Sequence, residues 1–135
     1  MIVVDSNVIA YCWIHGERTA LAHRLRRLDP DWHAPVLWRS ELRNILAGYR
    51  RDGSLDGGQV RRVMSAAEAG LGGREHHLPS DRVFAVLERS RLSAYDSEFV
   101  ALAEILDVRL VTEDRAILAA CADRAFSLES ALQVQ

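Results

Sequence analysis

Four acidic residues stand where a carboxylate is costly to place and can take part in chemistry. Asp5 ends the first apolar run of the chain, and Asp114 follows a later strand-like run. Glu41 borders the apolar stripe of a predicted helix, and Asp96 is predicted to begin another helix. Carboxylates brought together repel one another and resist full ionisation unless a cation joins them. Hard divalent cations prefer oxygen ligands, so four converging acids predict a Mg²⁺ or Mn²⁺ site.

Alternating strand and helix patterns predict the framework that would bring these acids together. The expected strands cover residues 2–5, 33–36, 74–78, 109–112 and a short piece after 125. The expected helices cover 8–14, 17–28, 37–51, 56–69, 82–90, 96–106, 114–121 and a short piece before 133. Ser6 or Asn7 is predicted to cap the first helix. This alternation indicates an α/β domain spanning residues 1–135, with a central, mostly parallel sheet flanked by helices. Strand ends and the helix starts that follow them are where such sheets build ligand sites.

Length and composition indicate an ordinary soluble protein. A chain of 135 residues, 49% hydrophobic and 27% charged, can bury a core as one domain. Two cysteines, Cys12 and Cys121, are too few for a disulfide framework and suggest a reducing compartment. The opening residues reach an acid too early for a signal peptide, and no apolar run approaches a membrane span. A cytoplasmic location without a membrane partner is therefore expected.

The basic residues are unusual, because all 17 are arginine and none is lysine. A coding bias towards arginine explains this most simply, although the planar guanidinium also suits phosphate groups. Seven clustered arginines are candidates for phosphate contacts, namely Arg24, Arg26, Arg27, Arg39, Arg43, Arg50 and Arg51. Base stacking by Trp13, Trp32 or Trp38 is an alternative to their burial in the core, and burial is favoured.

The absence of lysine also argues against several phosphate-handling enzymes. P-loop nucleotide enzymes need a lysine against the phosphates. Receiver domains and haloacid-dehalogenase-like phosphatases resemble this opening but place a lysine at the phosphoryl group. The phosphatase pattern also has a second aspartate two residues after the first, where this chain has Asn7. The five histidines lack the paired motif of a zinc site, and Cys121 lacks a placed base.

Each of the four acids also has an ordinary structural explanation when it is taken alone. Asp5, Asp96 and Asp114 can cap a helix or complement its dipole. Glu41 can extend to solvent or pair with Arg39 or Arg43. These explanations are compatible with metal binding, because a capping carboxylate keeps further lone pairs. Glu98, on another face of the helix that Asp96 begins, is expected to be solvated or locally paired.

The motifs around the acids resemble the PIN-domain ribonucleases. They are Asp5-Ser6-Asn7, Glu41 with Asn44, the run from Leu92 to Asp96 followed by Ala101 to Glu104, and the run from Val111 to Asp114. Their order, spacing and overall length are similar to the small prokaryotic branch, the VapC-type toxins of toxin–antitoxin pairs. The resemblance covers essentially the whole chain. Each motif is weak alone, and their combination in one chain of this size carries the resemblance.

This resemblance implies a three-layer α/β/α sandwich and a Mg²⁺- or Mn²⁺-dependent endoribonuclease that leaves 5′-phosphate and 3′-hydroxyl ends. It implies catalytic and metal-binding roles for Asp5, Glu41, Asp96 and Asp114, with Asp5 and Asp96 as the favoured direct ligands. Asn7 and Thr112 match positions that support the acidic site in that family. The implied partners are RNA, a small antitoxin that covers the acidic groove, and a second copy in a homodimer. Glu113, an extra acid beside Asp114, departs from the pattern. The alternative is a catalytically silent module that binds such a partner through the same groove.

Overall fold

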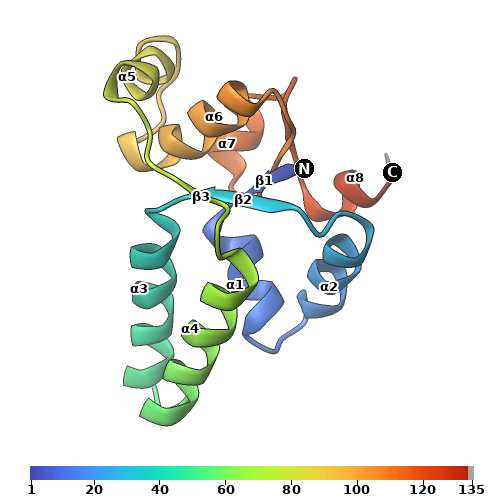
Figure 1. Ribbon diagram of the computed structural model, residues 1–135, viewed down its shortest axis with the longest axis vertical. Helices are drawn as coiled ribbons and strands as arrows, with labels where there is room; N and C mark the ends of the chain where they lie inside the picture. Colours follow the sequence, from blue (N-terminus) through green and yellow to red (C-terminus); the bar gives the residue numbers. More distant parts are fainter. Residues whose placement is uncertain (134–135) are drawn as a thin grey trace.

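A parallel sheet lies at the centre of the fold (Figure 1). The structure is a computed structural model that describes residues 1–133. Within those residues, five strands pair in parallel in the order β3-β2-β1-β4-β5. The strands are β1 (Ile2–Val4), β2 (Trp32–Pro35), β3 (Glu75–His76), β4 (Leu110–Val111) and β5 (Ala125–Phe126). The predicted parallel sheet is therefore confirmed.

Helices cover both faces of this sheet. Figure 1 shows α5, α6 and α7 on one face, and α1, α3 and α4 on the other, with α8 packed against α2. The helices are α1 (Ser6–Trp13), α2 (Thr19–Leu28), α3 (Trp38–Arg51), α4 (Gly57–Leu71), α5 (Ser80–Arg89), α6 (Ala94–Leu106), α7 (Arg115–Ala120) and α8 (Leu128–Gln133). The arrangement is the predicted three-layer α/β/α sandwich. Over residues 1–133, no helix combines the length and the apolar character needed to cross a membrane.

The apolar run of β1 is explained by its central place in the sheet. Its three residues are at most 1% exposed, because strands flank β1 on both sides and helices cover both of its faces. Trp32 and Trp38 are also fully buried, which confirms the expectation that they belong to the core. Trp13 is partly buried and packs edge-on against Trp32, with their ring centroids 6.1 Å apart.

Two helix starts differ from the sequence-based prediction. The first helix begins at Ser6, and Asp5 is its N-cap, so the prediction of Ser6 or Asn7 as the cap was wrong. The helix that carries Asp96 begins at Ala94 and is capped by Ser93, whose hydroxyl accepts the Asp96 N–H at 3.0 Å. Asp96 therefore lies in the first turn of α6 rather than at its start. In both cases a side chain that accepts a backbone N–H decides where the helix begins.

Gly70 is required by the close packing of α4 against Trp13. A Cβ atom at Gly70 would lie 2.3 Å from Cζ2 of the Trp13 ring, which no real contact allows. We expect Gly70→Ala to destabilise the protein by about 1 to 3 kcal/mol, because the ring is wedged between α4 and Trp32. Gly48→Ala is the matched control within α3, since the nearest atom to a new Cβ there is 4.0 Å away.

The control should gain about 0.5 to 1 kcal/mol from the better helix propensity of alanine. Urea unfolding of the two variants beside the wild type measures both effects. Equal shifts in the two variants would show that the Gly70–Trp13 contact relaxes freely and that the packing argument is wrong.

Candidate active site

The connections between strands place the site at the carboxyl ends of β1 and β4. The chain runs from β1 to β2 to β3 on one side, and then returns to place β4 on the other side of β1. This reversal makes a crevice at the strand ends, the usual ligand site of open α/β sheets. Asp5 follows β1 directly, Thr112 follows β4 directly, and Asp114 comes two residues later. The sheet topology therefore brings residues more than 100 positions apart to one edge.

Hydrogen bonds fix both carboxylate oxygens of Asp5. Its Oδ1 accepts the Ser6 N–H at 2.7 Å, and its Oδ2 accepts the Thr112 hydroxyl at 2.6 Å. The residue is only 6% exposed. Burial raises the pKa of Asp5 from 3.8 to about 6; the two hydrogen bonds lower it, and the charges of Glu41 and Asp96 raise it further. Asp5 is thus an oriented carboxylate whose negative charge is poorly compensated by the protein.

Glu41 reaches the same pocket from the first turn of α3. Its Oε1 accepts a hydrogen bond from the Ser6 hydroxyl at 2.7 Å, so Ser6 touches two of the four acids. Burial raises the pKa of Glu41, the Ser6 bond lowers it, and the charge of Asp96 raises it. Among residues 1–133, Glu41 forms no ion pair with Arg39 or Arg43, in contrast to the alternative drawn from the sequence.

Arg39 is held elsewhere by two other glutamates. Its Nε and Nη2 bind the two carboxylate oxygens of Glu75 at 2.8 and 2.6 Å, and its Nη1 binds Glu68. This bidentate pairing lowers the pKa of Glu75, chiefly through the hydrogen bond from Arg39. Arg39 therefore joins α3 to α4 and β3, and the expectation that it contacts phosphate is not supported by its position.

Asp96 and Asp114 complete the acidic set from two further helices. Burial raises the pKa of Asp96, and the charge of Asp114 adds to this effect. Asp114 caps α7, since its Oδ1 accepts the Ile117 N–H at 3.0 Å. Its own N–H donates to Thr112 Oγ1, also at 3.0 Å. Thr112 thus links Asp5 and Asp114 through a single hydroxyl.

All four predicted acids line one open pocket of about 400 Å³, together with Asn7. The remaining lining residues come from α1, from α3 and its N-cap, and from α6, and are Ser6, Leu37, Ser40, Asn44, Ile45 and Tyr95. Glu113, the extra acid, does not line it: Glu113 pairs with Arg18, which also binds Glu129 at 2.9 Å. The carboxylate of Glu113, the acid that departs from the family pattern, is therefore engaged outside the pocket.

The donor set fits a hydrated hard cation rather than one enclosed by side chains. Three of the four acids have pKa values raised by burial and by one another, and added positive charge would relieve this repulsion. Yet among residues 1–133 no three His, Cys, Asp or Glu side chains stand close enough to hold a metal ion directly. Mg²⁺ commonly keeps several waters and binds proteins through one or two carboxylates. A pocket lined by oxygen donors is compatible with this mode.

None of the seven arginines proposed for phosphate contact lines this pocket. Arg43 is two residues from Glu41, which turns it about 200° around α3. Arg43 and Arg50 therefore border a separate groove against α4. On α2, Arg26 lies over the Trp13 ring, and Arg26 and Arg27 line a third hollow. The arginines named as candidates for phosphate contacts thus lie outside the acidic pocket, and helix periodicity explains this for those of α3.

Several contributors to the site were not predicted. Ser6 was named as a possible cap and as part of the Asp5-Ser6-Asn7 motif, but its hydrogen bond to Glu41 was not predicted. Ser40 and Tyr95 line the pocket, and their adjacency to Glu41 and Asp96 was the available signal. Glu98 is partly buried, which raises its pKa, and the nearby charge of Glu41 raises it further. Glu98 is therefore close enough to Glu41 to feel its charge, which the sequence analysis did not expect, but it does not line the pocket.

The strand order and the helices on both faces of the sheet make a three-layer α/β/α sandwich, a fold shared with solved structures. The structure is similar to the crystal structure of PAE2754 from Pyrobaculum aerophilum, with a TM-score of 0.76 and 23% identity, over 98% of this chain and 87% of that one. It is also similar to the crystal structure of FitAcB from Neisseria gonorrhoeae, with a TM-score of 0.74 and 19% identity, over 96% of this chain and 99% of that one. No protein-family model matches the sequence, and neither does any curated protein. At these identities the likeness establishes the fold.

Proposed function

We propose that this protein is a metal-dependent endoribonuclease of the PIN type and acts as the toxin of a toxin–antitoxin pair. The observation that carries the proposal is the gathering of four acids around one pocket at the strand-order reversal, three of them with raised pKa values. RNA as the substrate rests on the resemblance of the sequence motifs to PIN-domain ribonucleases. The shared fold with PAE2754 and FitAcB supports the α/β/α sandwich that this resemblance implies.

The protein side chains would position a divalent cation and the substrate. Asp5 and Asp96 are the favoured direct ligands, with Glu41 and Asp114 holding coordinated waters or orienting the nucleophile. When bound, Mg²⁺ or Mn²⁺ would polarise the phosphoryl group and lower the pKa of water towards neutrality. Ligand carboxylates must be ionised, so binding has to displace protons from Asp5, whose pKa is about 6. Metal affinity should therefore increase as the pH rises through 6.

Cleavage of host RNA tests the nuclease. Purified protein, free of any partner, would be incubated with total RNA in Mn²⁺, in Mg²⁺ or in EDTA, and the new ends mapped. We expect discrete cuts in the metal lanes that leave 5′-phosphate and 3′-hydroxyl ends, and no cuts in EDTA. Equal cutting in EDTA would contradict a metal-dependent site. Absence of cuts from folded protein would favour the silent interaction module.

A small antitoxin is the proposed protein partner. An acidic pocket with no arginine among the described residues that line it is suited to receive one from another chain. A separate groove between α3 and α4 has an apolar floor of Leu46, Val60 and Met64, and would offer a second contact for the same partner. Expression of the wild type should stop growth, and Asp5→Ala should restore it. If the wild type and Asp5→Ala are equally toxic, the effect on growth does not depend on the acidic pocket.

A further inference from the structure

The loop between β4 and α7 presents two residues of the acidic site, Thr112 and Asp114, and Glu113 lies between them. The strand before this loop has two residues and the helix after it has six, so neither element anchors the loop over much length. Asp114 caps α7 with its Oδ1, and a shift of the loop would move the whole carboxylate. The position of the loop therefore decides where the Asp114 carboxylate lies in the pocket.

Glu113 is held at both its backbone and its side chain by the segment that follows β1. Its N–H donates to Oδ1 of Asn7 at 3.4 Å, and its carboxylate pairs with the guanidinium of Arg18. The Glu113 side chain is only 17% exposed, so leaving its charge without a partner would be costly. The acid that departs from the family pattern thus joins the loop after β4 to the segment after β1.

Arg18 also binds a third segment at the same edge of the sheet. Its Nη1 and Nη2 donate to the two carboxylate oxygens of Glu129 at 2.9 and 3.2 Å, in the first turn of α8. One guanidinium therefore ties together the segments that follow β1, β4 and β5, which are neighbouring parallel strands. The planar fork of arginine can hold two carboxylates in fixed directions, which the single ammonium of lysine cannot do.

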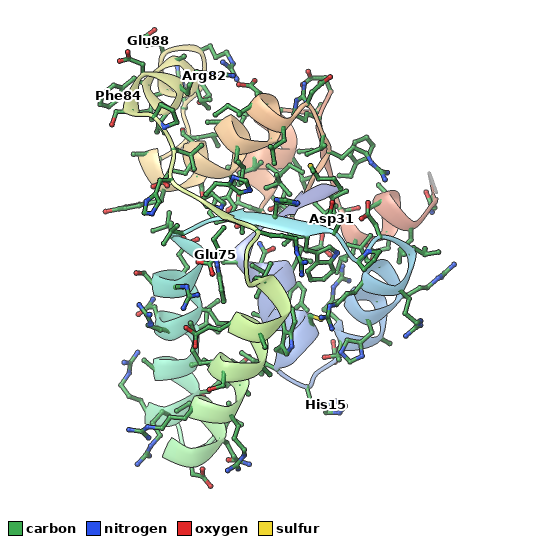
Figure 2. All side chains as sticks on the ribbon, viewed as in Figure 1. His15, Asp31, Glu75, Arg82, Phe84 and Glu88 are labelled. Carbon is green, nitrogen blue, oxygen red and sulfur yellow. The ribbon has the colours of Figure 1, made fainter. Side chains whose placement is uncertain are left out.

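The loop that carries Arg18 is itself closed by hydrogen bonds. The Thr19 hydroxyl accepts the Gly16 N–H at 2.9 Å and donates to the Ile14 carbonyl at 3.1 Å, and Thr19 is buried. Figure 2 shows His15 at the outer end of this loop, which joins α1 to α2. Arg18 thus extends from a fixed backbone, and its side chain can impose that order on the loop after β4.

We propose that Arg18 is a positioning residue of the acidic site, which acts through Glu113 to hold the loop that presents Thr112 and Asp114. This rests on the proposed function of the acidic pocket and adds a residue outside the set of four acids. Arg18 does not line that pocket, so its effect on a bound cation is exerted through the loop. The same ion pair keeps the Glu113 carboxylate from turning towards the acids and adding to their repulsion.

Removal of the ion pair without a change in net charge tests this assignment. The variant is Arg18→Met with Glu113→Gln, and Mn²⁺ binding to the RNA-free protein would be followed by electron paramagnetic resonance. We expect the affinity for Mn²⁺ to fall about 10-fold, the low end of the effect of replacing groups that orient metal ligands. A role confined to stability would leave the affinity of the folded protein unchanged. Arg18→Lys keeps the charge but loses the fork, and should show a comparable loss.

Hydrogen exchange in the metal-free proteins, followed by nuclear magnetic resonance, gives a readout that does not depend on nuclease activity. The Asp114 N–H donates to the Thr112 hydroxyl, and the Ile117 N–H donates to Asp114. Both amides should exchange about 10-fold faster in the variant without the ion pair, the low end of what a charged hydrogen bond contributes to a local opening.

The matched control is Arg89→Met with Glu104→Gln. This ion pair joins α5 to α6 on the other face of the sheet from α1, where Figure 2 labels Arg82 and Glu88 on α5, and its removal should change neither readout (Figures 1 and 2). Unchanged Mn²⁺ affinity or exchange in the variant without the Arg18 pair, full affinity of Arg18→Lys, or equal losses in the control would overturn the assignment. If the wild type binds no Mn²⁺, the proposed function fails, and the exchange rates still decide whether Arg18 holds the loop.

Discussion

The Asp96→Asn protein should fold normally and lose RNA cleavage by more than about 100-fold. Replacing groups that only support a metal ligand typically costs 10- to 100-fold, so loss of a direct ligand should cost more. Folding should be unaffected, because asparagine keeps the size of Asp96 and relieves its repulsion with Asp114. The Ser93 hydroxyl still accepts the backbone N–H of residue 96. Initial cleavage rates in Mn²⁺, with circular dichroism as the check on folding, measure both effects.

Glu98→Gln is the matched control for this variant. It removes a partly buried carboxylate from the same helix, and the pKa of Glu98 is also raised, first by burial and then by the charge of Glu41. Glu98 does not line the pocket, so this variant should keep most of the wild-type rate. Equal losses in the two variants would indicate a general charge effect. An active, folded Asp96→Asn protein would remove Asp96 from the chemistry.

The Asp5→Asn protein should be inactive and yet more stable than the wild type at pH 7.5. The folded-state pKa of Asp5 is about 6, against 3.8 for an unperturbed aspartate, so the folded protein binds this proton more tightly than the unfolded chain. The wild type therefore loses stability as the pH rises from about 4 to 6. The difference between the two pKa values corresponds to about 3 kcal/mol. Asparagine resembles the protonated form and should avoid most of that loss.

Urea unfolding in EDTA at pH 4 and pH 7.5 measures this effect. We expect the two proteins to be similar at pH 4 and the variant to be more stable at pH 7.5. The same stability difference at both pH values would contradict the raised pKa.

Thr112→Val should have the opposite effect on stability. It removes the hydroxyl that donates to Asp5 and should destabilise the folded protein by about 1 to 3 kcal/mol, because the buried carboxylate loses a donor.

The gain in stability and the loss of activity predicted for Asp5→Asn have a common physical cause. A carboxylate held in a buried position by Ser6 and Thr112 costs folding free energy while no cation is present. The same repulsion among the acids favours binding of a cation. Sites that bind charged ligands often keep such a cost in the free protein, and replacement of the charged group then stabilises the fold.

Much of the framework could be predicted from the sequence because its signals are local. The continuous apolar run of β1 indicates a strand covered on both faces, and the stripe with Trp38, Leu42 and Leu46 indicates α3. The ends of the helices and strands were predicted less accurately than their order. The strand predicted over 74–78 is only Glu75–His76, at the sheet edge, where pairing comes from one side.

The contacts that build the site depend on tertiary structure and could not be predicted in the same way. The hydrogen bond from Ser6 to Glu41 joins residues 35 positions apart, and Thr112 donates to Asp5 across 107 positions.

The positions of the arginines on α3, in contrast, could have been predicted from the sequence. The helical repeat alone places Arg43 and Arg50 on the face of α3 away from Glu41, so attention to periodicity would have excluded them from the acidic pocket.

Binding of Mn²⁺ to the RNA-free protein tests the central claim most directly, because it requires no knowledge of the RNA target. The signal of free Mn²⁺ in electron paramagnetic resonance would be followed as metal is added to the wild type, to Asp96→Asn and to Glu98→Gln at pH 7.5. We expect saturable binding by the wild type and by Glu98→Gln, and its loss in Asp96→Asn. Absence of saturable binding by the wild type, or equal binding by Asp96→Asn, would contradict a metal site at the four acids.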